Sequence, residues 1–188
     1  LLTQLIDLGI PIVMALNMAD TATELGMNIN VGKLADELGI PVLLISGRTG
    51  ENITRLSNEV EKLLKTSPDK TRKSFYEPTA NEKLIIEAVR QNLKEDNPYR
   101  ALQLAHHYQW LPFLSDSEKA ILATIVETKN FQSLRAQVDE TLERYDHFTP
   151  IVQDTIQKPP AFPNTPTDRL DAILTHKWSG PIVFIGVM

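Results

Sequence analysis

Residues 10–20 of the chain read Ile10-Pro11-Ile12-Val13-Met14-Ala15-Leu16-Asn17-Met18-Ala19-Asp20. The apolar part of this stretch is typical of a buried strand, and two polar side chains follow at the point where the strand would end. A second apolar run, Pro41-Val42-Leu43-Leu44-Ile45, ends in Ser46-Gly47-Arg48-Thr49-Gly50. The pattern therefore predicts two strands that each deliver polar or small residues to a loop.

The segment between the two runs has the periodicity of a helix. Its apolar residues are spaced i, i+3, i+4 and i+7, Asn30 can cap its start, and Gly39 can end it: Val31, Leu34, Ala35 and Leu38. A strand, a helix and a strand in succession favour a parallel pair with a helical crossover. Because the carboxyl ends of parallel strands meet at one edge, we expect Asn17, Asp20 and the Ser46-Gly47 turn to share a crevice.

The residues at this edge fit the chemistry of guanine. Guanine presents a ring N–H and an amino group side by side, so the ionised carboxylate of Asp20 can accept both hydrogen bonds, whereas adenine has no such donor pair. Asn17 can tie the base-binding loop to neighbouring backbone while touching the ring. Small residues at Ser46-Gly47 let backbone N–H groups approach a carbonyl oxygen. The alternative, a strand followed by a capping turn, remains open because Asn-x-x-Asp fixes only two positions.

Several motifs together resemble the ferrous iron transport protein B family. The resemblance runs through nearly the whole chain and rests on matches in three separate regions that occur in the family's order. The matching segments are Asn17-Met18-Ala19-Asp20, Gly26-Met27-Asn28-Ile29-Asn30, Leu38-Gly39-Ile40-Pro41-Val42, Ser46-Gly47-Arg48-Thr49-Gly50, Glu143-Arg144-Tyr145-Asp146 and Asp168-Arg169-Leu170-Asp171 through His176-Lys177-Trp178-Ser179-Gly180.

The resemblance implies an α/β part plus an all-α part: an incomplete P-loop-GTPase-type parallel sheet followed by a helical bundle domain. It also implies that GTP or GDP is the ligand. The family commonly has Ala at the position of Gly47, a departure that bears on the rigidity of the loop and on nucleotide affinity. The predicted guanine-nucleotide contacts are Asn17, Met18, Asp20, Ser46, Gly47 and Arg48.

No segment of the form Gly-x-x-x-x-Gly-Lys-Ser/Thr occurs in the chain. The chain also begins at Leu1 within what reads as the end of a helix, so we expect the phosphate-binding half of the site, and with it Mg²⁺, to lie upstream. Phosphoryl transfer depends on that loop and its metal ion. We therefore expect slow GTP hydrolysis only in the intact parent protein, none from this piece, and we assign no catalytic residues.

The predicted domain organisation follows changes in composition. We assign residues 1–66 to the end of a G domain, 67–77 to a linker, 78–157 to a helical regulatory domain, 158–167 to a Pro-rich linker, and 168–188 to a juxtamembrane helix and the start of a transmembrane segment. In the first part, an amphipathic helix is expected to pack on the sheet through Ile53, Leu56, Val60, Leu63 and Leu64.

Helix signals follow one another closely after residue 78. Thr79 with Glu82 and Ser115 with Glu118 have the spacing of capping boxes, and Asn97-Pro98 is a third helix start. Apolar stripes at helical spacing predict the buried faces of four or five bundled helices. These stripes are Ala101, Leu102, Ala105 and Tyr108; Ile121, Leu122, Ile125 and Val126; and Leu134, Val138, Leu142 and Tyr145.

Composition narrows the classes of ligand. The net charge of −5 argues against nucleic acid, and the absence of Cys excludes disulfides and thiolate chemistry. His106 and His107 are adjacent and would point in different directions on a helix, and His147 and His176 stand alone. We therefore predict no metal site on this chain.

The favoured hypothesis is a GTP-binding regulatory region of a ferrous iron transporter, on the cytoplasmic face of the bacterial inner membrane. By the resemblance its partners are guanine nucleotide, the membrane domain of the same polypeptide, and Fe(II) as the transported substrate; whether it forms a homo-oligomer is left open. The alternative is a soluble small GTPase fragment or a helical interaction module without a role in transport. Guanine against adenine nucleotide binding, with Asp20→Asn as the control, tests the favoured hypothesis.

Overall fold

The computed structural model describes residues 1–65, 74–157 and 174–177. The predicted linker from 158 to 167 and most of the predicted juxtamembrane and apolar end lie outside these residues. In the described part, no helix combines the length and apolarity needed to cross a bilayer.

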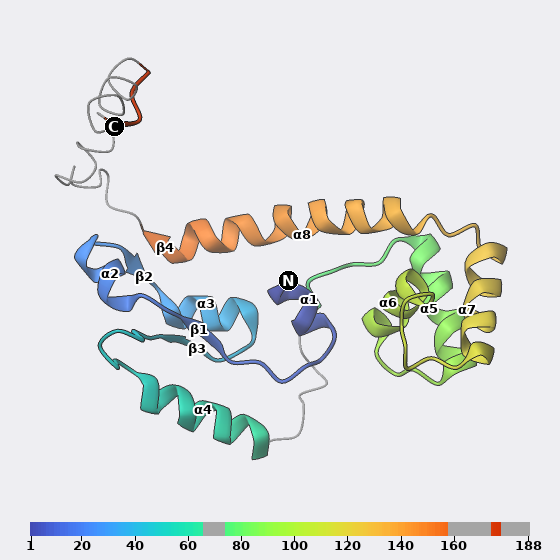
Figure 1. Ribbon diagram of the computed structural model, residues 1–188, viewed down its shortest axis with the longest axis horizontal. Coiled ribbons are helices and arrows are strands. Elements are labelled where there is room, and N and C mark those ends of the chain that lie inside the picture. The colour runs from blue at the N-terminus through green and yellow to red at the C-terminus, as the bar shows by residue number, and fades with distance from the viewer. Residues whose placement is uncertain (66–73, 158–173, 178–188) are drawn as a thin grey trace, which may run out of the picture.

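The first part of the chain contains a small parallel sheet with helices around it (Figure 1). Strand β1 (Met14–Leu16) pairs in parallel with β3 (Val42–Leu44), with Ala15 opposite Leu43. The remaining elements of this part are α1 (Leu2–Asp7), α2 (Ala19–Glu24), β2 (Asn28–Ile29), α3 (Val31–Leu38) and α4 (Ile53–Lys65). The predicted strand, helix and strand are confirmed.

The ends of α3 are fixed by the residues that the sequence indicates. The side-chain oxygen of Asn30 accepts a hydrogen bond from the Lys33 backbone N–H at 3.0 Å, which satisfies one of the unpaired donors of the first turn. Gly39 ends the helix with a φ of 62°, a conformation that glycine adopts without strain. The helix buries Leu34 and Leu38 against the sheet.

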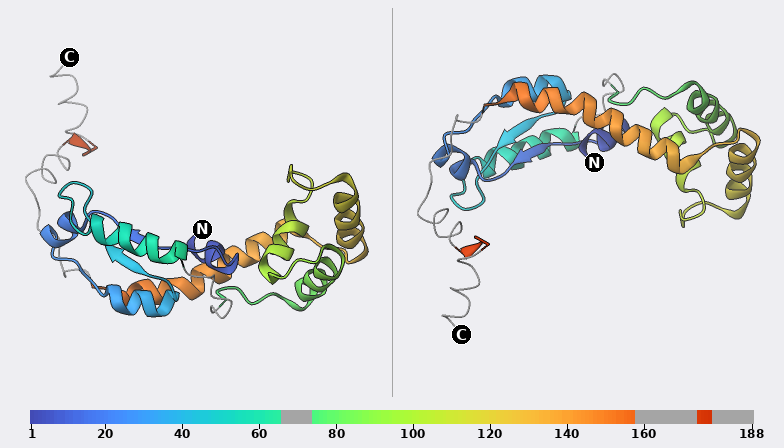
Figure 2. Two further views of the ribbon diagram at one scale, coloured as in Figure 1. Left: turned by 90° about the horizontal axis from the view of Figure 1, so that it is seen from below. Right: turned by 90° about the horizontal axis from the view of Figure 1, so that it is seen from above.

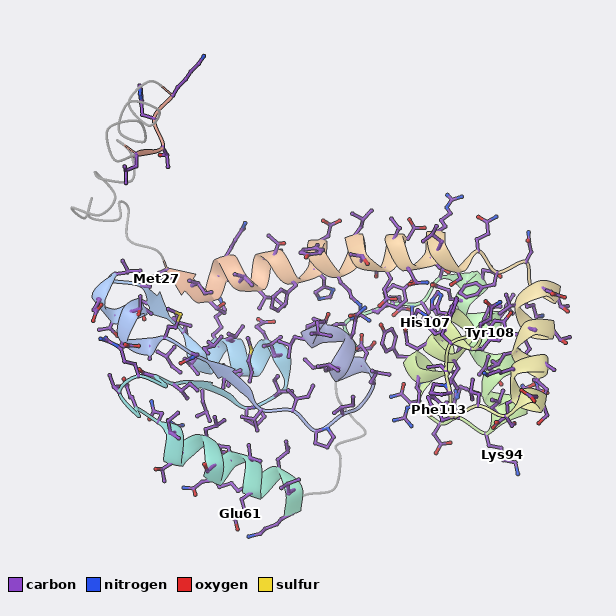
Figure 3. The ribbon with its side chains drawn as sticks, viewed as in Figure 1. Met27, Glu61, Lys94, His107, Tyr108 and Phe113 are labelled. Carbon is purple, nitrogen blue, oxygen red and sulfur yellow. The ribbon has the colours of Figure 1, made fainter. Side chains whose placement is uncertain are left out.

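Helix α4 departs from its predicted packing. None of its residues is buried, and Leu64 is 80% exposed. The helix runs below the strands in Figure 1, and Glu61 points away from them in Figure 3. The apolar stripe correctly predicts an amphipathic helix, but it does not determine whether a neighbour covers that stripe.

The second part of the chain is helical. It comprises α5 (Ala80–Leu93), α6 (Pro98–His107), α7 (Asp116–Thr128) and α8 (Ser133–Thr155). Both predicted capping boxes are formed, and Pro98 begins α6 after an Asn97 cap. Helices α5, α6 and α7 enclose a core that includes Ile85, Val89, Leu102 and Leu122, none of which is more than 1% exposed.

Helix α8 joins the two parts. It begins beside α7 and runs back over α1 and α3, as both views of Figure 2 show. Its far end packs Phe148 and Ile151 against the core around Leu34. The chain then forms β4 (Ile156–Gln157), which pairs antiparallel with β2.

The predicted buried stripe of α8 is wrong. Leu134, Val138, Leu142 and Tyr145 are 78%, 52%, 59% and 68% exposed, whereas the buried residues of this helix are Glu140, Arg144 and Thr155. Around Glu140 and Arg144 the helix turns a polar face towards its neighbours, and it leaves the predicted apolar stripe uncovered.

The two parts have separate hydrophobic cores. Phe75 and Tyr76, which are adjacent in the sequence, belong to different cores. Phe75 packs with Ile6 and Leu38 in the first core, and Tyr76 packs with Ile85 in the second. Both aromatic side chains are 3% exposed. The segment predicted as a polar linker therefore ends in two buried anchors.

Candidate functional site

The candidate site lies at the carboxyl ends of β1 and β3. Because the strands are parallel neighbours, the residues that follow each of them emerge at the same edge of the sheet. The Ile45 N–H donates to the Leu16 carbonyl at 2.8 Å, and the Ala19 N–H donates to the Ile45 carbonyl at 2.9 Å. These bonds hold the two loops side by side.

Asn17 connects the two loops through one oxygen. Its side-chain Oδ1 accepts from the Met18 N–H at 2.8 Å and from the Gly47 N–H at 3.1 Å. The expectation that Asn17 ties the loop to neighbouring backbone is confirmed. The sequence predicts that backbone N–H groups of the Ser46-Gly47 turn approach a carbonyl oxygen of the base, and in the structure the Gly47 N–H donates to Asn17.

Met18 turns the chain sharply between strand and helix. Its φ is 70°, in the left-handed region that few non-glycine residues adopt, and its side chain is 60% exposed. This turn lets α2 begin at Ala19, which is buried, and places Asp20 in the first turn of the helix. A carboxylate at this position also interacts favourably with the positive end of the helix dipole.

Asp20 is brought next to the second loop. Its side chain is 13% exposed, and its Oδ2 lies 2.5 Å from Arg48 Nε. Arg48, and then the Ser46 hydroxyl, hydrogen-bond to the carboxylate and hold the pKa of Asp20 below its usual value. Asp20 is therefore an ionised acceptor at neutral pH.

The second loop is built on a buried serine. Ser46 has no exposed surface, and its hydroxyl oxygen accepts from the Thr49 N–H at 3.2 Å. Its carbonyl accepts from Gly50, whose φ of 80° closes the turn. Arg48 extends outwards from this loop, with a side chain that is 69% exposed.

All six predicted contact residues thus gather at one edge of the sheet. Glu24, which the sequence reasoning did not include, also belongs to this group because its Oε1 lies 3.2 Å from Arg48 Nη2. Its position one helical turn after Asp20 could have indicated it, since residues four apart share a helix face.

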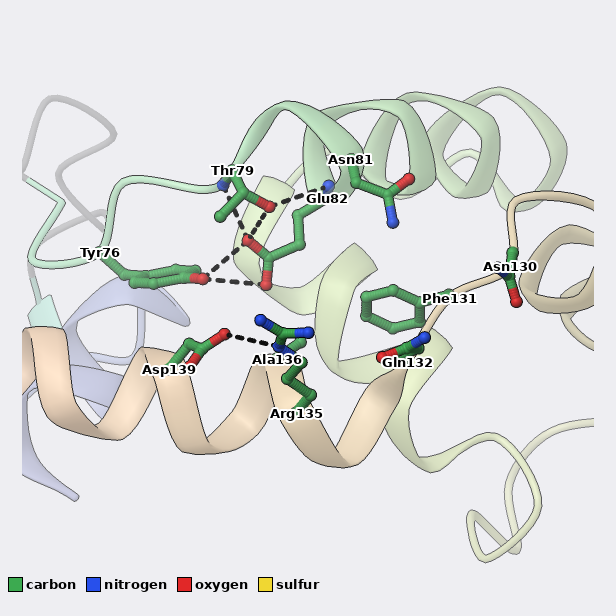
Figure 4. Close-up of a pocket in the computed structure, with 10 residues that line it drawn as sticks. All are labelled: Tyr76, Thr79, Asn81, Glu82, Asn130, Phe131, Gln132, Arg135, Ala136 and Asp139. Carbon is green, nitrogen blue, oxygen red and sulfur yellow. Dashed lines mark hydrogen bonds and ion pairs between the residues drawn. The ribbon is translucent and has the colours of Figure 1, made fainter.

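A cavity of about 300 Å³ lies elsewhere, between α5 and α8 (Figure 4). Its buried carboxylate, Glu82, accepts hydrogen bonds from the Tyr76 hydroxyl at 2.7 Å and from the Thr79 hydroxyl and N–H at 2.7 and 2.8 Å. Burial and the neighbouring Glu82 both raise the pKa of Tyr76, so its hydroxyl stays protonated. The polar groups of Tyr76, Thr79 and Glu82 thus hydrogen-bond to one another. We therefore assign them a structural role.

Within the described ranges, no three His, Asp or Glu side chains gather in a way that could hold a metal ion. His106 is engaged in packing: its ring centroid lies 4.9 Å from that of Phe131, and its Nδ1 lies 2.8 Å from the Ser133 hydroxyl.

The chain is similar to several known proteins. Residues 1–60 match the family model described as "Ferrous iron transport protein B". The Fe(2+) transporter FeoB of Staphylococcus aureus is 26% identical over 200 residues, an alignment that covers 100% of this chain and 29% of that protein. The Fe(2+) transporter FeoB of Synechocystis is 36% identical over 69 residues, which cover 37% of this chain and 11% of that protein.

The chain is thus similar along its whole length to proteins of the ferrous iron transport protein B family. Among solved structures, the cytosolic domain of L. pneumophila FeoB has a TM-score of 0.61 at 23% identity, covering 84% of this chain and 62% of that one. A GDP-bound mutant of the S. thermophilus FeoB G-domain has a TM-score of 0.56 at 26% identity, covering 82% and 62%. The chain spans 29% of the length of the S. aureus relative.

Proposed function

We propose that this chain is a guanine-nucleotide-binding cytosolic region of a ferrous iron transporter, in which Asp20 selects the base. The observation that carries the proposal is the meeting of an ionised Asp20 with the Ser46–Gly50 loop at the carboxyl edge of β1 and β3. The relatives described above, which include an Fe(2+) transporter and a GDP-bound G-domain, support the ligand and the transport context.

The proposed contacts divide the work between two loops. Asp20 accepts hydrogen bonds from the ring N–H and the amino group of guanine, because an ionised carboxylate has two acceptor oxygens. Asn17 fixes the distance between the loops through its bond to Gly47. Met18 and Arg48, which are exposed at the mouth of the site, flank the base.

In the whole transporter, we propose that an upstream phosphate-binding loop with Mg²⁺ completes the nucleotide site and allows slow GTP hydrolysis. The helical part from 78 to 157 would then regulate nucleotide exchange, and the region beyond 158 would lead into the membrane domain that carries Fe(II). The packing of α8 on both α3 and α6 supports such regulation, because one helix contacts both parts.

Base selection can be tested on this chain with nucleoside monophosphates. We expect GMP to shift the amide NMR resonances of Met18 and Gly47, and AMP to leave them in place. Asp20→Asn replaces one acceptor with a donor. The variant should therefore lose binding of GMP and gain binding of XMP, whose base has a carbonyl in place of the amino group. Asp36→Asn, on an exposed position of α3, is the matched control. Equal shifts with GMP and AMP would overturn the proposal.

A further inference from the structure

The carboxylate proposed to read the base has a partner within the protein itself. Arg48 Nε lies 2.5 Å from Asp20 Oδ2, and Arg48 Nη2 lies 3.2 Å from Glu24 Oε1. The guanidinium therefore sits between two carboxylates at the mouth of the crevice. Any ligand that hydrogen-bonds to Asp20 must share it with Arg48 or displace Arg48 from it.

The chemistry of the two donors is closely related. The edge of guanine that Asp20 would read consists of a ring N–H and an amino group on the same carbon, which is the N–C–N arrangement of a guanidinium group. Both are planar and present parallel N–H donors that a carboxylate accepts in pairs. The guanidinium differs in that it carries a positive charge, which strengthens its hydrogen bond to the carboxylate.

We propose that Arg48 is an internal competitor of guanine: it occupies Asp20 when the site is empty, and it must leave before the base can bind. This inference rests on the proposed function, because it assumes that Asp20 reads the base. Its consequence is that Arg48 weakens guanine binding and favours release of the nucleotide, the opposite of what a basic side chain near a nucleotide usually does.

Glu24 provides an alternative ion-pair partner for Arg48. Its side chain is 68% exposed and that of Arg48 is 69% exposed, so the guanidinium can rotate towards Glu24 without disturbing a packed core. Asp20, by contrast, is largely covered and is held by Ser46 as well. Glu24 is therefore the receiving carboxylate, the one that Arg48 binds after it leaves Asp20. Its negative charge favours this move, which leaves Asp20 free to bind the base.

The two residues thus have opposite predicted effects on affinity. Arg48→Gln removes the competitor and should lower the dissociation constant for GMP roughly two- to fivefold, the range expected for one exposed ion pair. Glu24→Gln removes the receiving carboxylate and leaves Arg48 on Asp20, so it should raise the dissociation constant. Both positions are exposed, so we expect both variants to fold.

The experiment titrates the unsubstituted chain and each variant with GMP and with AMP, following the amide resonances of Met18 and Gly47. Arg55→Gln removes the same charge at an exposed position of α4, outside the Ser46–Gly50 loop, so it controls for general attraction of the phosphate. In an Asp20→Asn background Arg48 has lost its partner there, so Arg48→Gln should no longer tighten nucleotide binding, measured with XMP.

The outcomes separate this inference from the function on which it rests. If the unsubstituted chain does not prefer GMP to AMP, the proposed function fails. If it does prefer GMP, but Arg48→Gln binds GMP no tighter or Glu24→Gln binds it tighter, the function stands and the competitor role of Arg48 is overturned. Tighter GMP binding by Arg48→Gln alone, with Arg55→Gln unchanged, supports the inference.

Discussion

Arg144 Nη2 of α8 lies 2.7 Å from Asp7 Oδ2 of α1, and both side chains are buried, 7% and 1% exposed respectively. The same guanidinium binds Glu140 through Nε at 2.7 Å and lies 4.9 Å from the centroid of the Tyr99 ring. This ion cluster therefore connects the sheet-containing part of the chain to the helical part.

The Arg144 cluster predicts a large loss of stability when the cation is removed. Arg144→Met leaves Asp7 and Glu140 as buried carboxylates without their cation, which costs about 3–5 kcal/mol of unfolding free energy. Urea denaturation followed by circular dichroism measures this difference. Arg135→Met on the same helix, where the side chain is 79% exposed, should change it by less than about 0.5 kcal/mol.

A second variant distinguishes the ion pair from loss of packing. Asp7 also accepts hydrogen bonds from the Phe75 N–H at 2.8 Å and the Ser74 hydroxyl at 3.2 Å, which Asp7→Asn can keep. If the charges are coupled, the double variant should cost less than the sum of the two single variants by roughly 0.5–3 kcal/mol. Strictly additive effects would show that Arg144 acts through packing alone.

His106 predicts a pH dependence of stability. Burial, with a smaller effect of the neighbouring His107, lowers the pKa of His106 to about 4, so the ring is neutral in the folded chain. In the unfolded chain its pKa is about 6.5, so the unfolded state takes up a proton first as the pH falls. The stabilising contribution of neutral His106 to the unfolding free energy is complete above pH ~6.5, and it is lost as the pH falls from there towards about 4.

Replacing this imidazole should reduce the acid sensitivity. We expect His106→Gln to lose roughly 1–3 kcal/mol less unfolding free energy than the unsubstituted chain between pH 7 and pH 4. Urea denaturation at the two pH values provides the measurement. His147→Gln, at an exposed position, is the control. Parallel loss of stability in all three proteins would rule out His106 as a source of the acid sensitivity.

Two leucines with similar sequence signals should behave differently. Leu122 and Leu134 both lie in stripes with helical spacing, but Leu122 has no exposed surface and Leu134 is 78% exposed. Leu122→Ala should cost about 2–5 kcal/mol through lost burial and the cavity it leaves. Leu134→Ala should change the unfolding free energy by less than about 0.5 kcal/mol. Thermal or urea unfolding compares them, and equal losses would contradict the burial described for α8.

Local features of this chain could be predicted from its sequence, whereas the burial of its long helix could not. Caps and turns are local, so the Thr79 and Ser115 capping boxes and the Gly39 helix end could be predicted from short spacings. The meeting of Asp20 with Ser46 could also be predicted, because parallel strands share an edge. The burial of α8 could not, since its contacts are set by charged side chains whose partner, Asp7, is more than 130 residues away in the chain.

We expect that replacing Gly47 by alanine stabilises the chain. A Cβ atom at this position would lie 3.7 Å from Asn17 Oδ1, an ordinary contact distance, so the loop has room for it. Gly47→Ala should therefore stabilise the chain by about 0.4–1 kcal/mol, because alanine has less backbone freedom to lose on folding. Gly50→Ala is the informative contrast: its φ of 80° would strain an alanine and lower the unfolding free energy. Differential scanning calorimetry of both variants tests this contrast, and a Gly47→Ala chain that melts below the unsubstituted one would show that this loop needs glycine.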